Sequence, residues 1–175
     1  MRAPLVVGNW KANGVQAESR ELARAIARAI LRKPPAVEVA LAPPYTSLAQ
    51  VKQAIHLSGV KLAAQNCHWE DRGAFTGEIT PLMLADLGCD FVIVGHSERR
   101  HILHESDVVI ANKLQAVLRN RLRPLLCIGE TLAERRAGRA TTVITRQLRI
   151  ALKGLDKSAL QNIEIAYEPV WAIGT

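Results

Sequence analysis

Lys11, His96 and Glu168 are side chains that could act together in acid–base chemistry, because each follows a short apolar run of the chain. A carboxylate, an imidazole and a cation suit proton abstraction beside a carbonyl. The carboxylate removes the proton, the imidazole polarises the oxygen and the cation stabilises negative charge. Spacing alone does not assign this reaction. The structural alternatives are an exposed strand-end carboxylate, a satisfied histidine and an ordinary loop lysine.

The apolar runs alternate with segments of helical spacing, and this alternation predicts a parallel sheet with helices outside it. In such folds the functional groups lie at the carboxyl ends of the strands. The expected strands are Leu5–Asn9, Val37–Ala42, Val60–Ala64, Phe91–Val94, Pro124–Ile128 and Ile163–Tyr167. The expected helices are Gln16–Lys33, Ser47–Leu57, Pro81–Leu87, Ser106–Arg121 and Thr131–Leu155, the last interrupted at Gly138.

Several residues predict where helices begin and end. Thr80 precedes Pro81 as a helix cap would, and Gly88 has the place of a residue that ends a helix. Thr131 and Glu134 have the spacing of a capping box.

The first predicted helix has an apolar face and an arginine stripe. The apolar positions that fall at helical spacing are Leu22, Ala25, Ile26, Ala29 and Ile30. Arginine recurs at every fourth position, Arg20, Arg24, Arg28 and Arg32, which predicts one solvent-facing stripe.

Composition favours a single globular domain over residues 1–175. Hydrophobic residues make up 49% of the chain and aromatic residues only 4%. A core of Leu, Ile, Val and Ala suits a parallel sheet that is buried on both faces. The net charge of +7 comes mostly from arginine. It is compatible with a small anionic substrate, whereas no aromatic residues interleave with the basic clusters as in a single-strand nucleic-acid binder. We therefore expect no nucleic-acid partner.

The cysteines, Cys67, Cys89 and Cys127, are odd in number and widely spaced. This pattern argues against a disulfide framework or a zinc site. No segment reaches the length of about 20 apolar residues that a membrane span needs. We expect a cytoplasmic protein without a membrane partner. His101, His104 and Glu105 have a spacing that could suggest a metal, but a solvated helix start is the favoured interpretation.

Five stretches of the chain resemble motifs of the triosephosphate isomerase family, in the same order and at the ends of the predicted strands. The resemblance covers the whole chain. The stretches are Gly8–Gly14, Gln65–Cys67 with Gly73–Ile79, Val94–Arg100, Cys127–Glu130 and Ala166–Thr175.

The resemblance implies a TIM-barrel-type parallel (β/α) architecture with about six βα units. It also implies that dihydroxyacetone phosphate and glyceraldehyde 3-phosphate interconvert through an enediolate, as in glycolysis and gluconeogenesis. The substrate would be a small phosphorylated triose, with no metal and no organic cofactor. The alternative function is a catalytically inactive barrel fragment or a self-assembling structural module that retains the motifs.

Residue roles follow from the same resemblance. Glu168 would be the base, His96 the neutral electrophile, and Lys11 the cation that faces the phosphate and the enediolate; this family is the standard example of such pKa tuning. Asn9 and Gly174 would contact the substrate together with Lys11. Glu98, near Lys11, and Cys127, a small residue near the mouth of the site, would have supporting roles. Thr76 would reach from one subunit into the site of its neighbour, whereas Glu130 is expected to be structural.

The sequence has fewer predicted βα units than the family that it resembles. Family members have eight βα units and about 250 residues, and the loops after strands seven and eight commonly build the phosphate site. Without those loops we expect a lower turnover rate and not only a higher KM. Six units would form an incomplete barrel or an unusually small closed one. Open edge strands invite pairing with another chain, so we expect a homo-oligomer that forms through the Gln65–Ile79 loop and the exposed edge strands.

Overall fold

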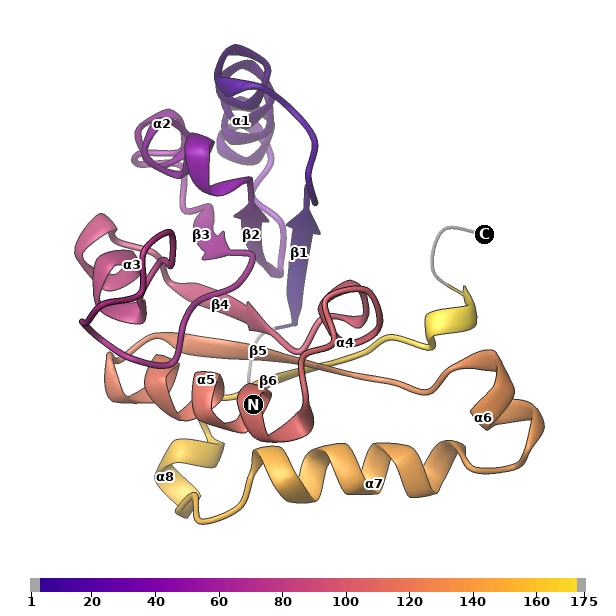
Figure 1. The fold of residues 1–175 in the computed structure, drawn as a ribbon. Coiled ribbons are helices and arrows are strands. Elements are labelled where there is room, and N and C mark those ends of the chain that lie inside the picture. Colours follow the sequence, from indigo (N-terminus) through magenta and orange to yellow (C-terminus); the bar gives the residue numbers. More distant parts are fainter. Residues whose placement is uncertain (1–3, 173–175) are drawn as a thin grey trace. The chain divides into compact units, whose positions relative to one another are not determined.

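The structure is a computed structural model that describes residues 4–172 (Figure 1). Six strands alternate with helices, and the strand order follows the chain order from β1 to β6. The strand pairs with a defined register are all parallel. The predicted α/β class with six parallel strands is therefore confirmed.

The chain divides into two compact units. The first contains the segment up to Asn66 and Met83–Val92, and the second contains Cys67–Leu82 and the segment from Ile93 onward. The interpretation of residues 1–175 as a single domain stays a prediction.

The first unit is a parallel sheet with helices packed beside it. Its sheet contains β1 (Leu5–Asn9), β2 (Glu38–Ala42), β3 (Lys61–Ala64) and the first half of β4 (Phe91–Val94). Its helices are α1 (Gln16–Arg32), the 3-10 turn η1 (Tyr45–Ser47), α2 (Leu48–Ala54) and most of α3 (Pro81–Leu87). The central strand residues Leu62 and Ala63 are fully buried, because α2 covers β3 on one side.

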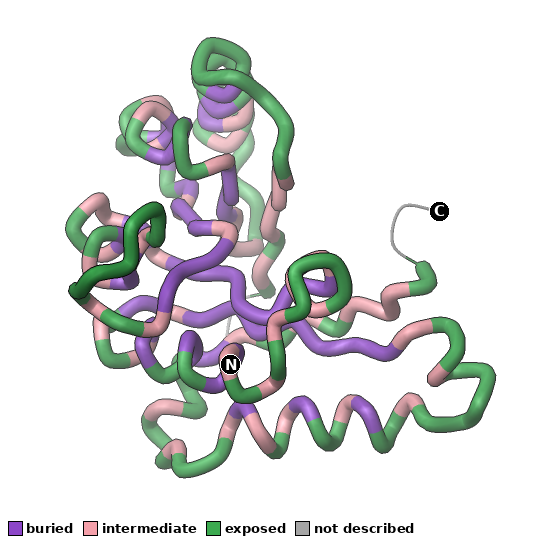
Figure 2. Tube along the Cα trace, viewed as in Figure 1, coloured by how far each residue is buried: buried purple, intermediate pink, exposed green. Residues whose placement is uncertain are grey.

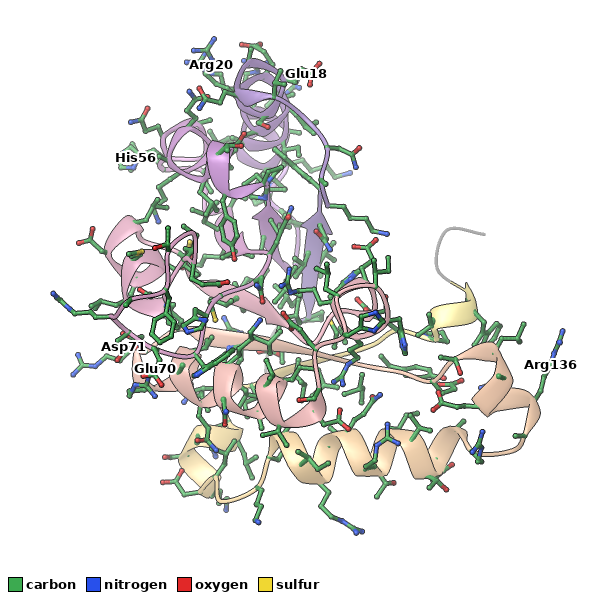
Figure 3. All side chains as sticks on the ribbon, viewed as in Figure 1. Glu18, Arg20, His56, Glu70, Asp71 and Arg136 are labelled. Atoms are coloured by element: carbon green, nitrogen blue, oxygen red, sulfur yellow. The ribbon has the colours of Figure 1, made fainter. Side chains whose placement is uncertain are left out.

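Helix α1 packs through small residues and not through the face predicted from the sequence. Its buried residues are Ser19, Ala23 and Ala27, spaced four apart, while Leu22 is 49% exposed. Ala25 and Ala29 are also exposed, whereas Ile26 and Ile30 are half-buried, so the most buried face is displaced from the apolar positions read from the sequence. Small side chains allow α1 to lie close to α2 and η1, which it contacts. The predicted arginine stripe is confirmed as exposed, and Figure 3 shows Arg20 extending away from the ribbon.

The second unit is built around β5 (Arg123–Ile128), which is buried at every position after Arg123 (Figure 2). Strand β6 (Glu164–Tyr167) pairs with β5 in parallel, and α5 (Asp107–Arg119) and α7 (Ala140–Ala151) both contact β5. The remaining elements are α4 (Ser97–His101), α6 (Leu132–Arg136), α8 (Lys157–Leu160) and the 3-10 turn η2 (Val170–Ala172). In β6, Ile165 and Tyr167 are 52% and 50% exposed.

Most of the helix boundary signals are confirmed. Thr131 and Glu134 form the predicted capping box of α6. Gly88 and Gly138 have φ values of +84° and +69° and lie where α3 and α6 end. The structure places the end of α7 at Ala151 and not at Leu155.

A buried ion cluster stabilises the second unit. Glu105 accepts from Lys113 and, at 2.6 Å, from Arg99, and the Glu105 and Lys113 side chains are almost fully buried. His101 and His104 are exposed. Residues 4–172 contain no group of His, Cys, Asp and Glu side chains that could hold a metal ion. Within the same residues, no helix combines the length and the apolar content needed to cross a membrane.

Candidate active site

In the second unit, the ends of β4 and β6 bring His96 and Glu168 together. The Nε2 atom of His96 lies 3.6 Å from Oε1 of Glu168. The other carboxylate oxygen, Oε2, accepts from the backbone N–H of Ser97 at 3.3 Å. The His96 side chain is 9% exposed and that of Glu168 is 22% exposed. Because 3.6 Å exceeds a hydrogen bond, both groups can still engage another molecule.

A backbone hydrogen bond determines which ring nitrogen of His96 carries the proton in the neutral tautomer. His96 is the N-cap of α4, and its Nδ1 accepts from the backbone N–H of Glu98 at 3.2 Å. The Glu98 carboxylate lies 3.4 Å from the same nitrogen, but it is partly exposed and the N–H occupies the ring lone pair. A nitrogen that accepts carries no proton, so the neutral tautomer carries its proton on Nε2. The Nε2–H therefore faces Glu168.

Strand β5 supports the backbone of Glu168. The N–H of Glu168 donates to the carbonyl of Ile128 at 2.7 Å. Cys127 is buried beside the Glu168 carboxylate, and burial together with this carboxylate raises the pKa of its thiol. Cys127 is therefore a protonated, small side chain in this environment, consistent with a supporting role and not with a nucleophile.

Glu130 is fully buried and connects β5 to the segment after β6. Its carboxylate accepts from the Tyr167 hydroxyl at 3.0 Å, the Trp171 indole at 3.1 Å and Arg135 at 3.1 Å. Burial raises the pKa of Glu130, but the hydrogen bonds from Trp171, the backbone, Tyr167 and Arg135 outweigh it, so the pKa lies below its ordinary value. We call Glu130, Arg135, Tyr167 and Trp171 the Glu130 cluster. It fixes η2 to the end of β5.

Lys11 and Asn9 lie at the end of β1 in the first unit. Lys11 has a φ of +53°, a left-handed conformation that costs a non-glycine residue about 1 kcal/mol or more. Asn9 Oδ1 accepts from the N–H of Lys11 at 3.0 Å, and Gln65 donates to the carbonyl of Lys11 at 2.8 Å. Gln65 also donates to Ala42, so the end of β2 is part of the same support. The strain at Lys11 is maintained by two specific side chains, which is typical of a functional position.

The roles of two other predicted site residues stay predictions. Thr76 is exposed on the loop that follows β3, and its contact with a neighbouring subunit stays a prediction. Gly174 lies outside the described residues.

Four residues contribute to the geometry of the second unit without having been assigned a role from the sequence. Ser97 contributes a backbone N–H, and Gly129 contributes the absence of a side chain. Tyr167 and Trp171 contribute their polar atoms to Glu130. At position 129 the sequence contains a signal that could have been used. A glycine directly after an apolar strand indicates that another backbone approaches closely.

Comparison with known proteins identifies the family. The family model described as triosephosphate isomerase matches residues 4–175. The chain belongs to the triosephosphate isomerase family. The triosephosphate isomerase of Moorella thermoacetica is 46% identical over the whole chain, which covers 70% of that protein. That of Aquifex aeolicus is 48% identical over 98% of the chain, which covers 68% of that protein.

Solved structures agree with this assignment. The crystal structure of triosephosphate isomerase from Bartonella henselae has a TM-score of 0.88 to this chain, at 41% identity. The alignment covers 97% of this chain and 69% of that one. The chain thus spans about 70% of the length of the triosephosphate isomerases that it matches.

Proposed function

We propose that the chain interconverts dihydroxyacetone phosphate and glyceraldehyde 3-phosphate. The observation that best supports this function is the distance of 3.6 Å between His96 Nε2 and Glu168 Oε1. A carboxylate base and a neutral imidazole that donates from Nε2 are the pair for which triosephosphate isomerase is the standard example. Family membership supplies the substrate class.

In this proposal, Glu168 removes a proton from the carbon beside the carbonyl of the triose. The carbonyl oxygen becomes an enediolate oxygen, and the Nε2–H of His96 donates a hydrogen bond to it as negative charge develops. Glu168 then returns the proton to the neighbouring carbon. His96 gives its Nε2 proton to the former carbonyl oxygen and takes up the hydroxyl proton of the other enediolate oxygen, which becomes the new carbonyl, so that the isomerisation needs no other reactant. Lys11 is proposed as the cation that stabilises the enediolate and the phosphate, with Asn9 holding its loop in the left-handed conformation.

Isomerisation assays test the proposal directly. The 175-residue chain and its Glu168→Gln variant would be purified from a host without its own triosephosphate isomerase. We expect the variant to lose at least about 10³-fold in kcat with a similar KM, because the base acts only in the transition state. Equal rates for the two proteins would disprove the assignment and favour the inactive structural module.

Self-association is a second proposal, and exposed apolar residues favour it. Ile165 and Tyr167 of β6 and Phe75 of the Gln65–Ile79 loop all expose large side chains. The Phe75 ring packs on the ring of His68, with ring centroids 4.4 Å apart. This contact holds the Phe75 ring in place while part of it stays exposed to solvent. We propose that copies of the chain associate through these surfaces.

Sedimentation velocity over a dilution series measures this association. We expect a species heavier than one 19.2 kDa chain that dissociates on dilution. Phe75→Ser should weaken it at least tenfold, whereas Leu57→Ser, which changes an exposed leucine outside both surfaces, should not. A folded monomer at all concentrations would rule out the proposal.

A further inference from the structure

Arg100 is a buried arginine next to the proposed catalytic pair that the mechanism above does not use. Its side chain is 8% exposed. Nε donates to the carbonyl of Gly95 at 2.7 Å, Nη2 donates to the carbonyl of Cys127 at 3.1 Å, and Nη1 donates to Asp107 at 2.6 Å. One guanidinium therefore bonds to the end of β4, to β5 and to the start of α5.

The same residue holds both peptide groups of His96. The side chain of Arg100 binds the carbonyl of Gly95, which belongs to the peptide group before His96. The carbonyl of His96, in the peptide group after it, accepts from the backbone N–H groups of Arg99 and Arg100, at 2.9 and 3.1 Å, which do not depend on the side chain. The φ and ψ angles of His96, −52° and 144°, are thus fixed by the guanidinium on one side and by the α4 backbone on the other. These angles determine the direction in which the imidazole leaves the backbone.

The guanidinium also packs against Gly95 itself. Gly95 has a φ of +73°, and a Cβ at this position would lie 2.9 Å from Nη2 of Arg100. Glycine is required for the backbone conformation and for the close approach of the arginine. The peptide group between Gly95 and His96 therefore has little freedom to rotate.

The effect of Arg100 extends to Glu168. The peptide group after His96 contains the N–H of Ser97, which donates to Glu168 Oε2. Arg100 and Glu168 also line the same narrow crevice, together with Gly95 and Gly129. A shift of this peptide group would move a hydrogen-bond donor of the base as well as the imidazole.

Stability alone does not account for a guanidinium in this place. Burying a charge costs several kcal/mol, and a buried ion pair is often no more stabilising than well-packed apolar residues. Asp107 neutralises Arg100 and also accepts from Arg146 of α7 at 3.2 Å. An apolar side chain could fill the space, but it could not bond to two carbonyls at defined angles.

We propose that Arg100 is a positioning residue for the isomerisation: its guanidinium fixes the peptide group between Gly95 and His96 and so aligns the Nε2–H of the imidazole with the carboxylate of Glu168. The proposal rests on the proposed function for its kinetic effect, whereas its effect on the imidazole is independent of turnover. Displacement by a fraction of an ångström at such a site can cost about 10²-fold in rate.

Kinetics and NMR spectroscopy of Arg100→Met and Arg100→Lys test the proposal. We expect Arg100→Met to lower kcat about 10²-fold and to change KM less than about threefold, because the guanidinium bonds to the carbonyls of Gly95 and Cys127 and to Asp107 and is assigned no role in substrate binding. Arg100→Lys retains the charge and fewer hydrogen bonds, so its kcat should be intermediate. Millimolar guanidinium chloride should restore about tenfold in kcat to Arg100→Ala. Arg136→Gln, which changes an exposed arginine at the end of α6 (Figure 3), should match the unchanged chain.

The ¹⁵N spectrum of the histidine side chains separates this proposal from the proposed function. His96, assigned with His96→Gln, should show a single Nε2–H tautomer in the unchanged chain and a mixture of tautomers in Arg100→Met. If the unchanged chain shows no turnover, the proposed function fails, and the tautomer spectrum alone decides the role of Arg100. Arg100→Lys provides the same readout if Arg100→Met does not fold. Unchanged kcat, together with an unchanged His96 spectrum in a folded variant, would overturn the proposal.

Discussion

The backbone carbonyl of Glu168 lies directly against the Cα of Gly129. A Cβ on Gly129 would overlap this carbonyl oxygen, and the neighbouring Glu168 N–H donates to Ile128 at 2.7 Å. The segment after β6 therefore crosses the end of β5 at a distance that only glycine permits. The position of the proposed base depends on a residue that has no side chain.

Gly129→Ala should displace Glu168 and lower kcat about 10²-fold. The two backbones must separate to admit the methyl group, so the free energy of unfolding should also fall by about 1–3 kcal/mol. Isomerase assays and urea unfolding measure the two effects. Gly8→Ala is the matched control, since a Cβ at Gly8 meets its nearest neighbour at an ordinary 3.5 Å. An active Gly129→Ala with unchanged stability would contradict this geometry.

The Glu130 cluster should open in acid. The folded-state pKa of Glu130 lies below its ordinary value of 4.5. The stabilisation is therefore present above about pH 4.5, and it is lost as the pH falls through the lowered folded-state value. Protonation weakens the bonds to Tyr167 and Trp171, so Trp171 emission should shift to the red below pH 4.5. The Trp171→Phe variant isolates this signal from Trp10 and Trp69. Glu130→Gln should shift the emission already at pH 7, and a signal that does not respond to either change would refute the coupling.

Lys113→Met should destabilise the chain by about 3 kcal/mol. The substitution leaves the buried Glu105 carboxylate paired with Arg99 but not with Lys113, and breaking a buried ion pair typically costs 3–5 kcal/mol. Urea denaturation measures the loss, with the exposed Lys153→Met as the control. Adding Glu105→Leu should recover part of the stability, because the double variant has no buried carboxylate, and the Arg99 side chain, which is 30% exposed, can be solvated. Equal stability of Lys113→Met and the control would show that the pair is not coupled to folding.

The cysteine thiols should be unreactive in the folded chain. Burial raises the pKa of Cys67 and of Cys89 to about 12, and it also raises the pKa of Cys127. At pH 8 the thiols are therefore protonated as well as shielded, and the thiolate is the reactive form. Titration with a chromogenic disulfide reagent should detect no thiol before unfolding and three in denaturant. Rapid reaction of any cysteine in the folded chain would show that its segment opens.

The strands and several helices could be predicted because their apolar residues recur at the spacing of a strand or a helix, and because residues near their ends favour starting or ending a helix. Pro81 and Gly88 bound α3, and Thr131 and Glu134 begin α6 through contacts between near neighbours in sequence. Short-range chemistry of this kind is visible in the sequence alone.

Helix α4 and the turn η2 could not be predicted in the same way. Helix α4 is capped by the imidazole of His96 and is connected to β5 through Arg100, so its stability depends on residues distant in sequence. The turn η2 likewise depends on Glu130. In α1, tertiary packing selects Ser19, Ala23 and Ala27 over the larger apolar residues beside them. The roles of Glu168 and His96 were expected from resemblance, whereas the backbone donor from Ser97 required the structure.

The division of the chain into units has a consequence for synthesis on the ribosome. The segment Cys67–Leu82 leaves the ribosome before Ile93 and all later residues, with which it forms its unit. Until α5 emerges, Asp71 has no Arg119 to pair with, and the buried Cys67 and His68 have no core to enter. The nascent chain therefore exposes Cys67 and His68, which are buried in the folded unit, while Met83–Val92 completes the first unit. Non-native contacts of the nascent chain should concentrate on these two residues until α5 emerges.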